Sequence, residues 1–267
     1  MKILFRYVAL LPLMALCLSA CSPFARIPAG SFTMGNSIAA DTDITDASPH
    51  TVTVSEFYMA KNLVTWAEYQ AVQVWAASNG YTDMAAGYGK ADTHPVEMIS
   101  WWDSIKYCNA RSQKEGLTPV YTVNGAVMKT GTTVPAVNWT ANGYRLPTEA
   151  EWEKAARGGL SSAVNNFHPP HAPRSESYTT PVESFVVNGY GLKDVVGKVW
   201  QWCWDCYGTY DTASPTNPRG VLSDSSRVLR GGCWDDGAYP CCIADRYSYY
   251  PSNTGSIGLR VARSSVR

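Results

Sequence analysis

Residues 143–153 read GYRLPTEAEWE, and this stretch contains the clearest helix start in the chain. Thr148 and Glu151 have the spacing of a capping box, in which each side chain accepts a hydrogen bond from the other residue's backbone N–H. Pro147 stands just before the cap, and Gly158-Gly159 is a typical helix end. The stretch therefore predicts a short helix that follows an extended segment.

Two further capping boxes lie upstream and predict two more helices. Thr65 pairs with Glu68 before residues 66–77, and Ser100 pairs with Asp103 before a helix that Gly116 ends. Together with the first stretch, these signals predict about three helices, each with a defined beginning.

Short apolar or alternating segments predict strands at 27–35, 50–54, 199–202, 227–230 and 257–261. Asn124-Gly125 predicts a hairpin between residues 120–123 and 126–128, because both turn residues must adopt positive φ. The predicted fold class is α+β: one loop-rich domain over residues 27–267, with short antiparallel strands.

The N-terminus has the features of a lipoprotein signal. Lys2 and Arg6 precede an apolar run over residues 7–18 that is too short to span a bilayer, which takes about 20 residues. Small residues lead to Cys21, as lipid attachment requires. We expect a signal peptide over 1–20, a lipidated tether over 21–26 and lipidation of Cys21. The alternatives are an ordinary secretory signal with a chance cysteine, and a buried N-terminal helix.

Composition limits the partners and the chemistry. Lys+Arg and Asp+Glu each number 22, so the net charge is zero and no nucleic-acid partner is expected. Apart from Cys17 in the signal and Cys21, the cysteines are Cys108, Cys203, Cys206, Cys233, Cys241 and Cys242. Their pairing stays open among about 15 connectivities. Cys203 and Cys206 form a single C-x-x-C, for which a structural role is favoured over zinc binding, since zinc needs four ligands.

Seven segments together resemble the sulfatase-modifying-factor family, the formylglycine-generating-enzyme type of C-type lectin fold. In order along the chain they are residues 30–35, 95–108, 143–153, 188–192, 197–202, 227–232 and 257–260. The resemblance implies that fold for the whole mature chain. It does not imply the activity, because one fold can carry many functions.

The residues that would support catalysis differ from the family pattern. Enzymes of the family hold copper through two closely spaced cysteines that follow a Gly-Gly pair. Here Gly231-Gly232 places Asp236 at the first cysteine and Cys241 at the second. Two thiolates suit copper(I) and one does not. We therefore expect no enzymatic activity, no catalytic residue and no cofactor; the alternative is a copper oxidase of the formylglycine-generating type that uses Cys241 with Cys233 or Cys242.

The family's calcium-binding segment is also changed. Lys198 and Gln201 stand where the family has Asn and Glu. Because calcium prefers oxygen ligands and carboxylates in particular, these two replacements weigh against calcium, and we expect no metal at this position.

The segment 233–256 has a composition of its own. It lacks Lys, Glu, Gln and Met, and it is rich in Tyr, Asp, Ser, Gly, Asn, Cys and Pro. Antibody paratopes use much of this alphabet, because Tyr gives rigid contact area and small polar residues adapt their hydrogen bonds. Randomising the adenines of an AAC codon also yields most of these residues. The segment resembles the variable region of proteins diversified by a retroelement, in particular the treponemal variable lipoproteins.

That resemblance implies a ligand-binding surface in the variable segment 233–256. Its predicted hot spots are Tyr239, Tyr247, Tyr249 and Tyr250, with Asp235 and Asp236 supplying charge. The expected site residues are Cys233, Trp234 (a framework residue), Asp235, Asp236, Gly237, Tyr239, Pro240, Asp245, Tyr247, Ser248, Tyr249, Tyr250, Ser252, Asn253, Gly255 and Ser256. A simpler interpretation is that the segment is no more than a solvated loop of the lectin fold.

The sequence thus predicts a monomeric lipoprotein, held by the lipid on Cys21 in the outer membrane and facing the cell surface. Its ligand would be a protein or a glycan. The rival hypothesis without binding is a structural envelope protein. Other prominent residues are expected to be structural: Trp200, Trp202 and Trp204 as one packed sheet face, and Arg230 and Arg260 as salt-bridging framework.

Overall fold

The structure is a computed structural model of the 267-residue chain. It describes residues 22–38, 42–159, 178–212, 216–221, 225–236 and 240–265. The predicted signal peptide, Cys21, residues 160–177, Gly237 and Tyr239 lie outside these ranges. In the described ranges, no helix has the length and hydrophobicity needed to cross a membrane.

Three helices occur in the described residues, and all three begin where the sequence predicts. They are α2 (Trp66–Ala77), α3 (Trp101–Lys114) and α4 (Glu149–Ala156). Each has a complete capping box, formed by Thr65 with Glu68, Ser100 with Asp103 and Thr148 with Glu151. Local hydrogen bonding therefore sets the helix starts, as the capping signals indicated.

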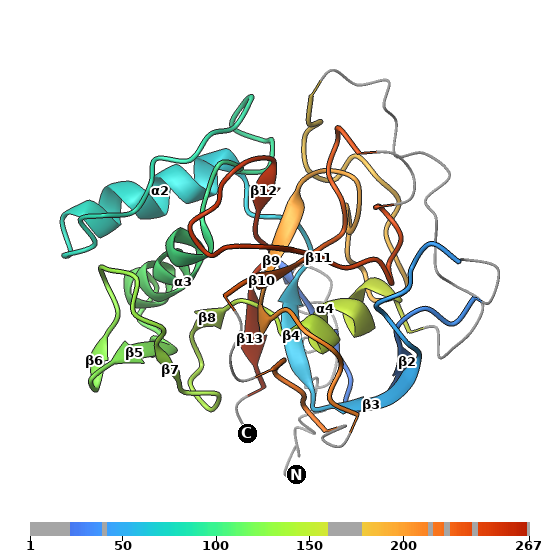
Figure 1. The fold of residues 1–267 in the computed structure, drawn as a ribbon. Coiled ribbons are helices and arrows are strands. Elements are labelled where there is room, and N and C mark those ends of the chain that lie inside the picture. Colours follow the sequence, from blue (N-terminus) through green and yellow to red (C-terminus); the bar gives the residue numbers. More distant parts are fainter. Residues whose placement is uncertain are drawn as a thin grey trace, which may run out of the picture.

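One sheet brings the two ends of the domain together. Its order is β1 (Phe24–Ile27), β4 (Phe57–Ala60), β13 (Ala262–Ser264) and β8 (Tyr144–Arg145). Both β1 and β13 pair antiparallel with β4. β1 and β13 therefore lie on the two sides of β4, and Figure 1 shows β13 beside β4. Residues 24–26, which the sequence assigned to the tether, form most of β1, so the predicted tether is too long.

A second sheet carries the variable segment. Its order is β11 (Tyr247–Tyr249), β10 (Arg227–Arg230), β9 (Trp200–Cys206) and β12 (Ile257–Gly258). β10 pairs antiparallel with both β9 and β11, whereas β12 runs parallel to β9. The sequence predicted β9, β10 and β12, the last of them too long, and it did not predict β11.

Two small sheets complete the fold. β2 (Gly30–Met34) pairs with β3 (His50–Val54), so the strand predicted over 27–35 is divided between β1 and β2. β5 (Tyr121–Val123) pairs with β6 (Ala126–Val127) and β7 (Ala136–Val137). The β5–β6 turn has φ values of 51° at Asn124 and 79° at Gly125, which confirms the predicted hairpin.

The core is rich in tryptophan. Trp101 and Trp202 are fully buried, and their indole N–H groups donate to the carbonyls of Cys203 at 2.9 Å and Ile99 at 3.1 Å. Trp200 and Trp204 pack on the same cluster as Trp202, as predicted for alternating residues of one strand. Buried indoles need such partners, so these rings fix α3 against β9.

The six cysteines of the described residues are buried thiols: Cys108, Cys203, Cys206, Cys233, Cys241 and Cys242. Cys203 and Cys206 of the C-x-x-C both lie in β9 and contribute to the core. Free cysteine behaves as a small hydrophobic residue when it is buried. Their packing agrees with the structural role that the sequence favoured.

Candidate functional site

Both ends of the variable segment attach to one strand, β9 and the residues just before it. Cys233 forms a bridge with Lys198, and the Trp234 N–H donates to the Lys198 carbonyl at 3.1 Å. At the other end, the Trp200 N–H donates to the Ser256 carbonyl at 2.9 Å. The segment is therefore a loop whose two ends are held close together by the core sheet.

The C-terminal part of the segment also rests on the start of α3. The N–H of Met98 donates to the carbonyl of Gly255 at 2.8 Å, and the N–H of Trp101 donates to the carbonyl of Pro251 at 3.0 Å. These are backbone interactions of the segment, so they persist when its side chains change.

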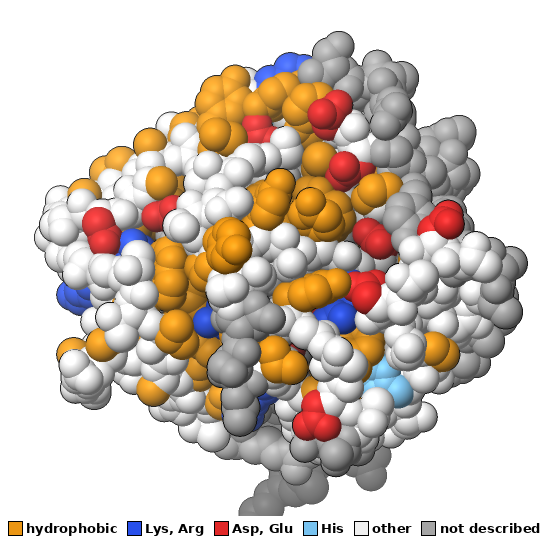
Figure 2. Space-filling model, in the orientation of Figure 1, with side chains coloured by type: hydrophobic (Ala, Val, Ile, Leu, Met, Phe, Trp, Pro, Cys, Tyr) orange, Lys and Arg blue, Asp and Glu red, His pale blue; other side chains and the backbone are white. Residues whose placement is uncertain are grey.

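Between these anchors the segment exposes large aromatic side chains. Tyr247, Tyr249 and Tyr250 are 46%, 38% and 59% exposed. The ring of Tyr247 lies 5.5 Å from that of Trp200 and 5.3 Å from that of Tyr249. On the same face of the molecule, hydrophobic side chains gather over β12 and the loops beside it, and acidic side chains border them (Figure 2). Exposed aromatic groups of this kind are typical of interaction surfaces.

The remaining predicted site residues divide by burial. Asp235 and Ser252 are exposed; Trp234, Asp236, Pro240, Ser248, Asn253, Gly255 and Ser256 are half-buried. Cys233 and Asp245 are only 6% and 8% exposed, so their expected place on the contact surface is corrected: both side chains belong to the support beneath it. Gly237 and Tyr239 are not among the described residues.

Burial changes the chemistry of Asp245. Loss of solvent raises the pKa of its carboxyl to about 6, although Arg230 acts in the opposite direction. Nearby Asp46 and Asp236 raise the pKa further, because like charges disfavour ionisation. Asp245 therefore titrates just below neutral pH.

A buried ion-pair network ties the segment to α4. The Arg246 guanidinium binds both carboxylate oxygens of Glu149, with distances of 2.6 Å from Nε and 3.0 Å from Nη2. Arg230 pairs with Glu153 and lies 3.5 Å from Glu149. Although burial opposes it, Arg230, Arg157 and the Gly35 N–H together lower the pKa of Glu153. The framework role predicted for Arg230 is confirmed by these contacts, and Arg246 has a framework role as well.

Arg260 differs from the prediction. It is fully buried, but it donates to the carbonyls of Ala60, Lys61, Lys193 and Asp194 and to the Gln201 side chain, and no carboxylate pairs with it among the described residues. Burial lowers its pKa to about 10. Arg260 is a framework residue that binds backbone oxygens, and the expected salt bridge is wrong.

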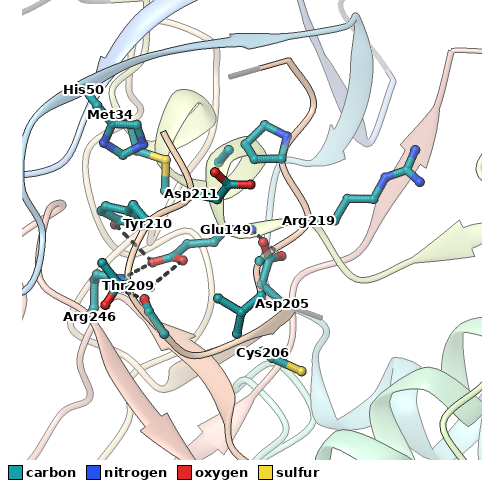
Figure 3. A pocket seen from close by; sticks show the side chains of 15 residues that line it. Met34, His50, Glu149, Asp205, Cys206, Thr209, Tyr210, Asp211, Arg219 and Arg246 are labelled. Atoms are coloured by element: carbon teal, nitrogen blue, oxygen red, sulfur yellow. Dashed lines mark hydrogen bonds and ion pairs between the residues drawn. The ribbon is translucent and has the colours of Figure 1, made fainter. Parts of the chain in front are cut away.

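A pocket of about 480 Å³, including its open mouth, lies beside the Arg246–Glu149 pair. In Figure 3 the side chains of Glu149, Tyr210 and Arg246 point toward one another, with Asp205 nearby. Asp205 accepts the Glu149 N–H at 2.8 Å, and burial together with Glu149 raises the pKa of its carboxyl far above the usual value. Asp205 could not be identified from the sequence, because a single Asp in a tryptophan-rich strand matches no motif. The ion pair beside Asp205 joins Arg246 of the variable segment to Glu149 of α4.

The donor set for copper is not suitable in this chain. Asp236 accepts the Cys233 N–H at 2.7 Å, so its carboxylate serves the loop. Burial raises the pKa of both Cys233 and Cys241 to about 12, which disfavours the thiolate that a metal needs. In the described ranges, no group of three His, Cys, Asp or Glu side chains is arranged to hold a metal ion.

Lys198 and Gln201, at the positions of the family's calcium-binding segment, make other contacts in this chain. The Lys198 ammonium lies against the Thr180 side chain, 3.1 Å from the Pro181 carbonyl and 3.8 Å from Asp194. The Gln201 side chain donates to the Val195 carbonyl at 2.6 Å and accepts from the Trp152 indole at 3.0 Å. Because a fixed cation already lies among these oxygens, the residues present do not fit a calcium ion.

The fold and its framework define a class of protein. The model of the sulfatase-modifying factor enzyme 1-like domain matches residues 18–265, and the chain belongs to this family. Its architecture is the C-type lectin fold of the formylglycine-generating-enzyme type, as the sequence predicted.

The relatives include proteins named as a chaperone, an enzyme and a variable protein. The chain is 31% identical over 256 residues to the chaperone protein LppX of Paenibacillus barcinonensis, covering 81% of this chain and 83% of that protein. It is 30% identical to the formylglycine-generating enzyme of Streptomyces coelicolor, covering 90% and 88%. The solved structure of Treponema denticola variable protein 1 superposes with a TM-score of 0.74 at 29% identity, covering 91% of this chain and 95% of that one.

Proposed function

We propose that this protein is a non-catalytic, surface-displayed lipoprotein that binds a protein or glycan ligand through the variable segment 233–256. The observation that carries the proposal is the contrast between the two layers of that segment. Tyr247, Tyr249 and Tyr250 are exposed, whereas Arg246 and Cys233 beneath them are buried. A rigid base with exposed tyrosines is the arrangement that paratopes use.

The similarity to a solved structure named Treponema denticola variable protein 1 supports the proposal that this fold carries a variable segment. The composition of residues 233–256 supports diversification by a retroelement, because the residue types match randomised AAC codons. Sequencing the gene and its flank tests the second point. A near-identical template copy beside a reverse transcriptase gene is expected, and its absence would remove the diversification claim.

Binding is tested with purified residues 22–267 on arrays of glycans and of extracellular protein domains. The variant with Tyr247→Ala, Tyr249→Ala and Tyr250→Ala is expected to lose the array signals by at least about tenfold, since central tyrosines dominate such interfaces. Val74→Ala is the matched control, because Val74 is 73% exposed and lies on α2. Signals that are equal in the triple variant and the original protein would contradict the proposal.

The copper-oxidase alternative is favoured only by membership in a family that includes enzymes. Titration with copper(I), combined with an oxygen-uptake assay, separates the two hypotheses. We expect no stoichiometric binding, because the thiols of Cys233 and Cys241 resist ionisation. Stoichiometric copper with turnover would establish the oxidase instead.

A further inference from the structure

The strand β11 lies at an edge of its sheet. The sheet order is β11-β10-β9-β12, so β11 pairs with β10 on one side only. Among the described residues, no backbone hydrogen bond joins residues 247–249 to any segment other than β10. In an antiparallel pair, successive residues alternate between facing the partner and facing away. At least one of the three residues of β11 therefore directs its backbone N–H and C=O outward, where another strand can pair.

The side chains of β11 form an aromatic platform beside this edge. Tyr247 and Tyr249 are two residues apart and so lie on the same face of the strand. Their rings are 5.3 Å apart and edge-to-face, and Trp200 supports Tyr247 at 5.5 Å. Tyr250 follows directly and is the most exposed of the three tyrosines. The faces of such rings attract cations.

The charges around the platform are negative. Asp235 is exposed. The pKa of the Tyr247 hydroxyl is raised by burial, then by Tyr249, and by a smaller effect of the negative charge of Asp236. Residues 233–256 contain one cationic side chain, Arg246. Its guanidinium side chain is 2% exposed and is bound by Glu149, so it does not offset these acids at the surface. The surface therefore complements a cationic partner.

We propose that the ligand is a protein segment in extended conformation that carries Lys or Arg side chains and adds as a strand alongside β11. Its backbone bonds to the free edge of β11, and its cations lie over the tyrosine rings and beside Asp235 and Asp236. Strand addition gives affinity through the main chain and specificity through side chains. This inference rests on the proposed binding function and selects its protein ligand over a glycan.

Strand addition has a particular advantage at a variable surface. The backbone bonds of β11 do not depend on which side chains stand at positions 247 and 249. A changed side chain therefore alters which ligand residues are preferred, while the docking direction and the main-chain bonds remain.

The test selects a phage-displayed library of random dodecapeptides on purified residues 22–267. Enriched peptides are expected to carry more Lys and Arg than the input library, and their binding should weaken between about 0.05 M and about 0.5 M salt. Asp235→Asn should weaken binding of the best peptide by about threefold, as for an exposed ion pair. Asp92→Asn, at an exposed acid near the start of α2, is the matched control and should leave binding unchanged.

The backbone contribution is tested on the same peptide by N-methylation of single amides. Methylation along one edge of the peptide should abolish binding, and methylation along the other edge should not. The inference would be overturned if methylation along neither edge abolished binding. It would also be overturned if no peptide were enriched, or if the enriched peptides carried no excess of Lys and Arg.

The outcomes separate this inference from the proposed function. The reference variant carries Tyr247→Ser and Tyr249→Ser, with its folding checked by thermal unfolding. Neutral or acidic peptides that bind the original protein but not this variant would overturn the cationic ligand and leave the binding surface in place. Peptides that bind both proteins equally would overturn the two proposals together.

Discussion

Asp245 makes the stability of the variable segment depend on pH. Its carboxyl is 8% exposed, and burial raises its pKa to about 6, above the value near 4 of an unfolded chain. Between these two values the folded state holds a proton that the unfolded state has lost. The stability that Asp245 contributes therefore falls as the pH rises from about 4 through about 6.

Replacement of Asp245 by Asn should show this effect directly. At about pH 7 the Asp245→Asn variant should be more stable than the original protein by about 1–2 kcal/mol, and the difference should disappear near pH 4. Urea unfolding at several pH values measures it. Asp235→Asn, at an exposed position, serves as the control and should show no such trend. A difference for Asp245→Asn that stays constant with pH would show that the folded-state pKa is not raised.

At the scale of the elements, the variable segment contains some positions at which substitution should destabilise the fold and others at which it should not. Arg246 is held by Glu149 on both carboxylate oxygens, whereas its neighbours Tyr247, Tyr249 and Tyr250 are exposed. Removing one partner of a buried ion pair leaves a buried charge without compensation, whereas exposed side chains contribute little to folding.

We therefore predict that Arg246→Met lowers the free energy of unfolding by about 3–5 kcal/mol. Tyr250→Ala, in the same segment, should change it by less than about 0.5 kcal/mol. Chemical denaturation of the two variants, side by side, measures both values. Similar losses in the two variants would mean that the exposed positions also support the fold.

The elements also show how far the sequence could predict. Capping boxes and the Asn124-Gly125 turn are local signals, so α2, α3, α4 and the β5–β6 hairpin were predicted correctly. β11 was not, because Tyr247 to Tyr249 form a strand through pairing with the distant β10. The burial of Cys233, Asp245 and Asp205 likewise depends on contacts between distant segments, which no local pattern records.

For the whole molecule, the relation between the predicted anchor and the binding surface matters. β1 begins at Phe24, within the predicted tether and three residues after Cys21, and lies in the sheet β1-β4-β13-β8. The variable segment belongs to the other four-stranded sheet. A lipid on Cys21 would therefore hold the domain through one sheet while the other sheet presents the ligand-binding segment.

Replacement of Cys21 tests that anchor. In cells fed labelled palmitate, the original protein should take up label and remain with membranes. Cys21→Ser should lose the label and appear in soluble fractions, because one thioether-linked lipid is the expected anchor. Cys108→Ser is the control, since Cys108 is buried in the folded domain. Labelling that survives in Cys21→Ser would exclude lipid attachment at this position.

The attachment of both ends of the variable segment to β9 has a consequence for its length. The Lys198–Cys233 bridge and the β12–β9 pairing keep the two ends adjacent, so the residues between them form a closed loop. The entropy of closing such a loop grows only slowly with its length, by about 0.6 kcal/mol for each doubling. The segment should thus behave as a cassette: inserts placed directly after Asp236, which leave the buried residues 241–244 in place, should not change the shape of the host domain.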